Sequence, residues 1–488
     1  MPRFTRREFL EDTLFAAAVA ATAGAQATAH AAEVPAVRKI GPNDQVRVAV
    51  LGIRSRGRDH LSHYAAMNDV TVAAICDPDP SFFEAAAKIL TDKGKPKPAF
   101  VQDLRRVMED KDIDAVSIAT PNHWHSLAAI WAMQAGKDVY VEKPVSHNVH
   151  EGRVMVDTAR KYNRICQAGT QCRSMQGSID AIDYIHSGKI GKVKVARGLC
   201  YKTRNTIGKV GAGQIPAGLD YDLWCGPAPK KPLTRTNLHY DWHWVWDTGN
   251  GDLGNQGIHQ VDVARWGLGK DTMPRSVVGY GGRLGYVDDG ETPNTHVMVL
   301  DYGDSQLIFE TRGLKTGKYL PKGIAPTNAG AGVGNVFHGT DGYVALTSYS
   351  GGAAFDKDGN LVTTFKGDGN HYRNFIDAVR SRDVKSLRGE CNEGHLSSAL
   401  CHLGNISYLV GEQVSFGSGP KVANEFEQDT WERFVSHLGE NGVDTMGGTY
   451  RLGRKLDLNV KKETFKDGEA NKHLSREYRK GFEVPNKA

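Results

Sequence analysis

The stretch from Val46 to Asp77 constrains the fold of this chain more than any other. Val46 to Leu51 is a continuous run of β-forming residues, and a glycine-containing segment and a helical stretch follow it. A second β-rich run, Val70 to Cys76, ends at Asp77. A strand, a glycine turn, a helix and a strand that ends in an acidic residue predict a βαβ unit of a parallel sheet.

The turn of this unit, Gly52-Ile53-Arg54-Ser55-Arg56-Gly57, indicates a dinucleotide site. Gly52 permits the tight turn and Gly57 permits close helix packing, whereas Arg54 replaces the glycine that usually lets backbone approach a pyrophosphate. Arg54 must therefore swing aside or meet the phosphates with its guanidinium. Asp77 can accept ribose hydroxyls and would repel a 2′-phosphate, which favours NAD over NADP as the cofactor. A βαβ unit without a ligand is the alternative.

Two further strands end in polar motifs. Ala115 to Ala119 runs into Thr120-Pro121-Asn122-His123-Trp124-His125, and Val139 to Val141 runs into Glu142-Lys143-Pro144. Pro144 ends the strand and forces Lys143 out of the helical region, which puts an ammonium group where parallel sheets bind ligands. The alternative is a surface lysine at a strand end. We expect the two histidines to line the nicotinamide edge, because the motif lacks the carboxylate or cysteine of a metal site.

Taken together, these motifs resemble the Gfo/Idh/MocA family, the relatives of glucose-fructose oxidoreductase and inositol dehydrogenase. The resemblance covers about residues 44 to 412, and the end of the chain, Glu477 to Phe482, resembles an exported bacterial branch. It implies a Rossmann domain and a cis Lys143–Pro144 bond. The cofactor-binding residues that we expect are Gly52, Ile53, Arg54, Arg56, Gly57, Asp77, Thr120, Pro121, Asn122, His125, Glu142 and Lys143.

The pattern changes after Ala168, where strand-like segments follow one another without long helices between them. The predicted fold class is therefore α/β, with a doubly wound parallel Rossmann sheet and a C-terminal α/β domain that has a large, open, mostly antiparallel sheet. We expect the domains at 44–168 and 169–412, with an extension at 413–488 that packs on both. The glycine-rich run Gly317 to Gly334 is expected to be a loop that serves as a lid or an oligomer contact, and the chain is expected to form a homo-oligomer.

The segment His239 to Trp246 is the main candidate for a substrate wall, because it holds three tryptophans within five residues. Aromatic faces stack on the C–H surfaces of sugar rings, and neighbouring polar groups can bond their hydroxyls. A core-packing cluster is the alternative. Trp224 is a further candidate for this wall. The substrate-binding residues that we expect are Trp242, His243, Trp244, His239 and Asp241.

A second candidate stretch, Gly249 to Asp262, enters a predicted helix. Asn255 and His259 lie one helical turn apart and are expected to face one cleft. By the resemblance, Lys143, Asn255 and His259 form the catalytic group, with Asn255 in the place of the family's aspartate. Asparagine cannot take a proton, so His259 acts alone or with a nearby carboxylate such as Asp252 or Asp262.

The first 32 residues read as an export signal and not as part of the fold. Thr5-Arg6-Arg7-Glu8-Phe9-Leu10 matches the twin-arginine pattern, a short apolar run follows, and Ala29-His30-Ala31 offers a cleavage site. We therefore expect a periplasmic or exported protein with no membrane span after processing. The seven cysteines contain no CxxC pair, which indicates buried thiols, and the net charge of +5 disfavours a nucleic-acid partner.

Three functions fit these residues. The leading hypothesis is an oxidoreductase with tightly bound NAD that transfers hydride from a hydroxyl of a sugar, glycoside or cyclitol, with Lys143 polarising that hydroxyl and His259 as the base. The second is a glycoside-cleaving enzyme that oxidises a ring hydroxyl transiently, eliminates and then reduces again. The third is a non-catalytic sugar- or nucleotide-binding protein, which the intact Glu142-Lys143-Pro144 disfavours.

Overall fold

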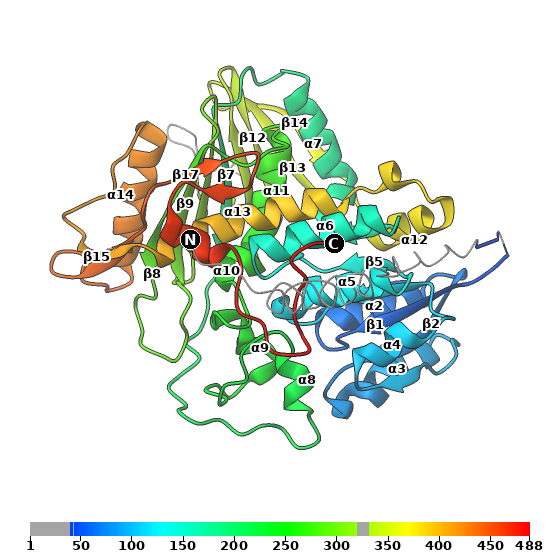
Figure 1. Ribbon diagram of the computed structural model, residues 1–488. Coiled ribbons are helices and arrows are strands. Elements are labelled where there is room, and N and C mark those ends of the chain that lie inside the picture. The colour runs from blue at the N-terminus through cyan, green and yellow to red at the C-terminus, as the bar shows by residue number, and fades with distance from the viewer. Residues whose placement is uncertain (1–39, 42, 320–330) are drawn as a thin grey trace, which may run out of the picture. The chain divides into compact units, whose positions relative to one another are not determined.

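The computed structural model describes residues 40–41, 43–319 and 331–488 (Figure 1). The export signal and residues 320–330 of the glycine-rich run lie outside the described residues, so the expectations for them stay predictions. Within the described ranges, no helix is long and apolar enough to cross a membrane.

The first domain is built on a six-stranded parallel sheet with the strand order β3-β2-β1-β4-β5-β6, which is the Rossmann order. Its strands are almost continuously apolar because helices cover both faces. The strands are β1 (Val46–Leu51), β2 (Val70–Cys76), β3 (Ala99–Val101), β4 (Ala115–Ile118), β5 (Asp138–Val141) and β6 (Cys166–Ala168). The helices are α2 (Arg56–Ala65), α3 (Phe83–Thr91), α4 (Leu104–Glu109), α5 (His125–Gln134) and α6 (Val149–Lys161).

The second domain contains a twelve-stranded sheet in which β7 and β10 are parallel and the other pairs are antiparallel. The predicted α/β fold with a large, mostly antiparallel second sheet is thereby confirmed. Ten strands lie along the order β14-β13-β12-β11-β7-β10-β9-β8-β16-β15, and β17 pairs with β8 and β18. They are β7 (Val195–Tyr201), β8 (Ser276–Gly282), β9 (Thr295–Asp301), β10 (Gln306–Arg312), β11 (Val333–His338), β12 (Gly342–Ser348), β13 (Gly351–Asp356), β14 (Leu361–Lys366), β15 (Glu412–Ser415), β16 (Thr449–Leu452), β17 (Leu456–Asn459) and β18 (Thr464–Phe465).

Helices α7 (Gln176–His186), α11 (Gly257–Gly267) and α13 (Cys391–Leu409) pack on one face of this sheet and share its core (Figure 1). Helix α12 (His371–Ser381) does not pack on the second sheet. It packs on the first sheet instead, because Phe375 and Ile376 are buried with residues of β1 and β2 in the first domain. The apolar spacing of α12 predicted a buried face but not which of the two sheets would receive it.

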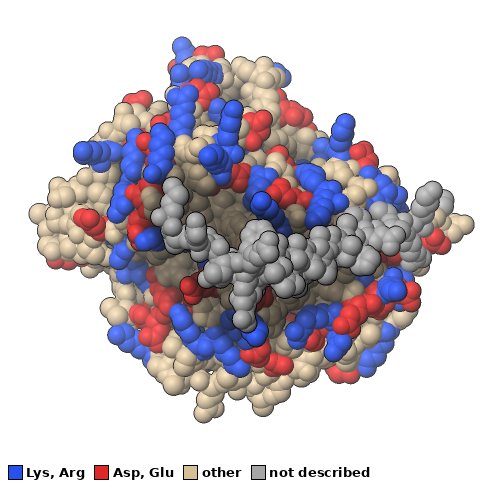
Figure 2. All heavy atoms as spheres, in the orientation of Figure 1, with Lys and Arg blue, Asp and Glu red and all other residues tan. Residues whose placement is uncertain are grey.

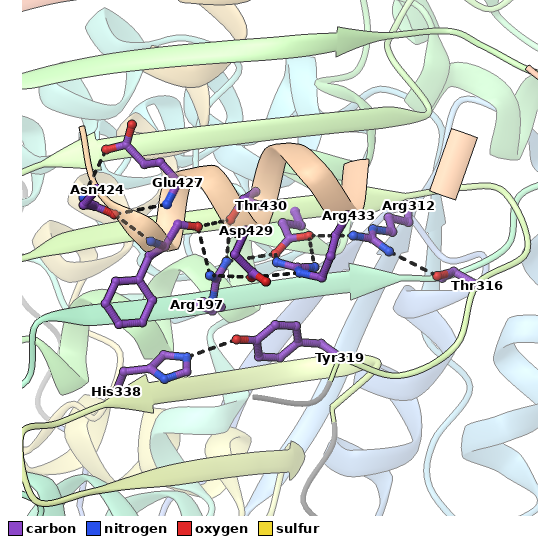
Figure 3. A network of polar contacts seen from close by, with 12 residues as sticks. Arg197, Arg312, Thr316, Tyr319, His338, Asn424, Glu427, Asp429, Thr430 and Arg433 are labelled. Carbon is purple, nitrogen blue, oxygen red and sulfur yellow. Dashed lines mark hydrogen bonds and ion pairs between the residues drawn. The ribbon is translucent and has the colours of Figure 1, made fainter. Parts of the chain in front are cut away.

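The extension after residue 412 adds strands to the second sheet and places α14 (Glu425–Glu440) on its other face. Figure 3 shows the polar network beneath this helix. The fully buried Arg197 of β7 donates to Glu310 at 3.2 Å and to Thr430 at 2.6 Å, and Arg433 donates to Glu310 at 2.7 Å. A buried carboxylate shared between arginines tolerates little displacement, so this network holds α14 in one register on the sheet.

The charged side chains and the cysteines are placed as the composition predicts. Figure 2 shows basic and acidic side chains interspersed over the visible face, as a nearly balanced chain predicts. All seven cysteines are buried free thiols, which confirms their interpretation as core residues.

Candidate active site

One cleft collects most of the predicted site residues. It has a volume of about 240 Å³ and opens at the carboxyl ends of β1, β2, β4 and β5, where a parallel sheet binds its ligands. The second domain closes its opposite side. The first domain contributes Gly52, Arg54, Arg56, Asp77, Thr120, Pro121, Asn122, His125, Glu142 and Lys143, and the second contributes Leu223, Trp224, His239, Tyr240, Trp242, His243 and Asn255.

The glycine turn forms one end of the cleft. Gly52 has φ +78°, and a Cβ there would lie 2.7 Å from the backbone of Ala119, so only glycine fits. The guanidinium of Arg54 lies over the ring of Phe82, 4.9 Å from its centroid, and thus to one side of the turn. Arg54 thus lines the cleft with its guanidinium on Phe82, and its contact with the phosphates stays a prediction. Ile53 and Gly57 support the turn from behind and do not line the cleft.

Asp77 follows β2 and is held by the same turn. Its carboxylate accepts hydrogen bonds from the backbone N–H groups of Ile53 at 3.1 Å and Asp79 at 3.0 Å. Burial raises the pKa of Asp77 to about 6. The buried hydroxyl of Thr120, which also lines the cleft, has no hydrogen-bond partner. A carboxylate and an unsatisfied hydroxyl in one cleft fit a ligand with hydroxyl groups, as the ribose of NAD requires.

Asp77 can be tested directly as the residue that selects NAD. In Asp77→Asn the shape is kept but the charge is lost, and we expect NAD affinity to fall on the order of 10-fold or more, as for a charged hydrogen bond. NADP should lose less, because the repulsion of its 2′-phosphate is removed. Calorimetric titration with both dinucleotides measures this difference. Asp92→Ala, on the exposed side of the same domain, serves as control. Unchanged NAD affinity in Asp77→Asn would contradict the assignment.

Glu142 and Lys143 lie where the cleft passes from one domain to the other, and the Lys143–Pro144 bond is cis, as the resemblance implied. The buried Glu142 carboxylate accepts from Arg56 Nε at 2.8 Å and from Gln171 at 2.9 Å, and His60 lies 3.2 Å away. Burial by itself would raise the pKa of Glu142, but Arg56 and His60 bring it well below its usual range. Glu142 is therefore a carboxylate that ties the glycine turn to the strand carrying Lys143.

The ammonium group of Lys143 donates to the backbone carbonyl of Asn255 at 3.0 Å. This hydrogen bond joins the end of β5 to the end of α10 (Gly251–Asn255) in the second domain. Burial lowers the pKa of Lys143 below its usual value, and the positive charges of Arg56 and Lys202 act in the same direction. Lys143 therefore lies at the domain junction inside the cleft and is not the alternative surface lysine.

His125 and His123 hold backbone segments in place. The ring nitrogens of His125 lie 2.6 Å from the carbonyl of Pro144 and 2.7 Å from that of Thr120. His125 lines the cleft as expected, whereas the ring of His123 lies behind it, against the carbonyls of Trp224 and Thr248. The expectation that both histidines line the cleft is thus wrong for His123, because its ring is turned into the contact between the domains. Asn122 bonds Asn250 there at 3.0 Å.

Asn255 and His259 are separated by a helix break. Asn255 ends α10 and lines the cleft, while His259 lies in the first turn of α11, behind the lining residues. The expectation that one continuous helix turns both toward the cleft is therefore wrong. The ring of His259 lies 5.0 Å from that of Tyr349, and its buried Nδ1 has no hydrogen-bond partner. Burial, together with the charge of Lys143, lowers the pKa of His259 to about 3, so the imidazole is neutral.

Neither carboxylate proposed to support His259 does so. Asp252 is paired with Arg204, which donates to it at 2.6 and 2.8 Å. Asp262 accepts from Arg173 at 2.8 Å and from Ser397 at 2.7 Å. Both carboxylates are therefore already paired with arginines. The described residues contain no cluster of histidine, cysteine and carboxylate side chains that could hold a metal ion.

The aromatic segment splits between wall and core. Trp242, His243 and His239 line the cleft, and the rings of Trp242 and His243 stack with centroids 3.6 Å apart. Trp244 is buried beneath Arg204, and Asp241 does not line the cleft. The core-packing alternative thus applies to Trp244, whereas Trp242, His243 and His239 lie at the cleft; that they bind a sugar stays a prediction. Trp224 lines the cleft, as does Tyr240, which the sequence analysis missed although it lies between two predicted wall residues.

The fold and the cleft define a two-domain protein with an NAD-binding type of Rossmann domain. Residues 46–170 match the Gfo/Idh/MocA model described as "Oxidoreductase family, NAD-binding Rossmann fold". Residues 189–280 match the C-terminal alpha/beta domain model of the same family. The two segments are thus similar to the two domains of that family.

Among proteins with similar sequences, a glycosyl hydrolase family 109 protein of Shewanella pealeana is 31% identical over 205 residues, 39% of this chain and 44% of its own length. A glycosyl hydrolase family 109 protein of Saccharopolyspora erythraea is 32% identical over 160 residues, 32% of this chain and 35% of its own. The matched part of the chain thus spans less than half of either relative.

Solved structures share the fold. The WlbA dehydrogenase of Bordetella pertussis, in complex with NADH and UDP-GlcNAcA, superposes with a TM-score of 0.53 at 21% identity, covering 75% of this chain and 95% of its own. A putative oxidoreductase from Klebsiella pneumoniae has a TM-score of 0.54 at 18% identity, covering 81% and 100%.

Proposed function

We propose that this protein cleaves a glycoside by a redox-neutral route, with NAD held in the cleft between its domains. The observation that supports this most is the place of Lys143, whose ammonium group lies between the nucleotide side of the cleft and its aromatic side. The names of the family 109 relatives favour cleavage over net dehydrogenation. The proposal therefore prefers the second hypothesis of the sequence analysis to the first.

The residues that would hold the cofactor are the turn at Gly52, the carboxylate of Asp77 at the adenosine ribose, and Thr120 beside the nicotinamide half. Bound there, NAD would supply reversible hydride transfer to and from a ring carbon. Trp224 and Trp242 would stack on the sugar and orient it.

Lys143 supplies a positive charge at the oxygen of the reacting hydroxyl. That charge stabilises the oxyanion that develops when the hydroxyl loses its proton, and later the enolate of the transient ketone. The ketone acidifies the neighbouring C–H bond. A base removes that proton, the aglycone leaves from the next carbon, water adds to the resulting double bond, and the proton returns to carbon. Since the ketone is finally reduced again, glycoside and water become sugar and alcohol with no net oxidation.

His259 is the proposed base. Its imidazole is neutral, because burial and Lys143 lower its pKa to about 3, and this low pKa also makes it a weaker base than an exposed histidine. Its position behind the cleft lining means that it would act through a short relay or after a small shift of Asn255. A redox-neutral cycle also suits the proposed export of this protein, because the bound cofactor is reset in every turnover.

The test is to incubate the protein, purified with its NAD, with a panel of p-nitrophenyl glycosides in D₂O. We expect aglycone release over many turnovers without an added acceptor, no net change in cofactor absorbance, and one non-exchangeable deuterium in the sugar. A keto-sugar with reduced cofactor would show a dehydrogenase instead. Hydrolysis without deuterium uptake would show direct displacement, and either result would overturn the proposal.

A further inference from the structure

The last residues of the chain return to the first domain. We call residues 475–484 the C-terminal strap. It follows α15 (Gly468–Asn471), which packs in the core of the second domain, and it runs past α8 (Tyr221–Cys225) to end beside α5 and α6 (Figure 1). Phe482 and Val484, each 5% exposed, belong to the apolar core of the first domain.

Phe482 anchors the strap on Trp124. The two rings meet edge to face with centroids 5.6 Å apart, and Trp131 of α5 lies on the same side at 6.4 Å. Trp124 also contacts Gly226, which has φ +49°, and a Cβ there would lie 2.2 Å from the indole. The Trp124 indole thus contacts both the strap and the residue that follows α8, where there is room for no larger residue than glycine.

Arg479 binds the end of α8 directly. Its guanidinium donates to the backbone carbonyls of Asp222 at 3.1 Å and Gly226 at 3.2 Å, and to the Asp222 carboxylate. The Asp222 carbonyl also accepts the N–H of Gly226 at 3.0 Å, so the guanidinium of Arg479 bridges the first turn of α8 and the residue that follows the helix. With only five residues, α8 has little stability of its own.

Helix α8 forms part of the cleft wall, because it carries Leu223 and Trp224. The indole N–H of Trp124 donates to the carbonyl of Leu223 at 3.0 Å, and His123 lies 3.0 Å from that of Trp224. The wall is therefore held by side chains that reach it from the first domain and from the strap, and not by strand pairing.

A second set of contacts ties the strap to the segment after Pro144. Arg476 donates to the carbonyl of Asp247 at 2.9 Å and lies 3.0 Å from Nδ1 of His147, while the Tyr478 hydroxyl donates to Glu151 at 3.2 Å. The strap thus contacts α6 as well as the segment that leads from the aromatic wall to α10.

From these contacts we propose that the C-terminal strap positions the α8 wall over the cleft, with Arg479 as the positioning residue for the sugar ring that Trp224 contacts. The part of this inference that concerns the sugar rests on the proposed function. The part that concerns the wall does not, so the two can fail separately.

The test compares Arg479→Ala, Arg479→Lys and the matched control Lys480→Ala in the full chain with bound NAD. Lys480 is the exposed neighbour of Arg479. In Arg479→Ala we expect amide hydrogen exchange in residues 219–228 to rise roughly 10-fold, the factor for losing charge-assisted hydrogen bonds. The KM for the best p-nitrophenyl glycoside should rise by a similar factor, while kcat and NAD affinity change little. Arg479→Lys should restore part of both effects, and Lys480→Ala should change neither.

Three results would overturn the inference: unchanged exchange in 219–228, exchange that rises evenly over the whole chain, or faster local exchange with an unchanged KM. Phe482→Leu keeps an apolar anchor and should show the same local pattern in weaker form. Hydrogen exchange needs no substrate. If the protein were inactive on every glycoside, the proposed function would be disproved, and the exchange of residues 219–228 would still test whether the strap positions the α8 wall.

Discussion

Replacing Lys143 by Ala should lower kcat by at least 10²- to 10³-fold, on the order of the loss when one electrostatic donor of an active site is removed. NAD affinity should stay nearly unchanged, because Lys143 bonds the second domain through Asn255 and not the turn that would hold the nucleotide. Lys143→Met, which keeps the length of the side chain, should be equally inactive. Single-turnover kinetics and NAD titration of the same preparations separate the two effects. Turnover retained in either variant would remove Lys143 from the mechanism.

The charge of Lys143 also sets the expected pH dependence. Its pKa lies below the usual lysine value because the group is buried, so the cationic form is lost earlier as pH rises. Activity should therefore fall on the alkaline side below pH 10.5. In Lys143→Arg, any residual activity should lack this alkaline limb, because a guanidinium stays charged. An identical alkaline limb in the arginine variant would assign it to another group.

Replacing His259 by Ala should lower the rate by about 10²- to 10⁴-fold, the range for loss of a general base. The pKa of His259 lies near 3, so its neutral form persists at mildly acidic pH. The decrease of the rate at acidic pH should therefore begin only well below pH 6.5. His473→Ala, an exposed histidine in the second domain, serves as control. If His259→Ala weakens folding but leaves kcat of the folded fraction unchanged, the buried ring has a packing role only.

Much of the first domain could be predicted because its signals are local. A β-branched run, a glycine at a turn with positive φ, and an acidic residue at the next strand end all act within about thirty residues, so Val46 to Asp77 was predicted correctly. The place of Lys143 followed in the same way, from a strand that must end at Pro144. Strand β13 could not be predicted in this way. Its Gly351 and Gly352 are typical of a turn, and they form a strand only because β12 and β14 pair with them.

The sequence by itself therefore determined the parallel sheet, the turn at Gly52, Asp77 at the end of β2, and the lysine at the cleft. The tertiary structure alone decided that His259 lies behind Asn255, that α12 packs on the first sheet, and that Phe482 completes a core most of whose other members lie more than three hundred residues earlier. The physical reason is the same in each case. A turn or a strand end is set by neighbouring dihedral angles and hydrogen bonds, whereas the surface that buries an apolar face depends on contacts that no local stretch of sequence contains.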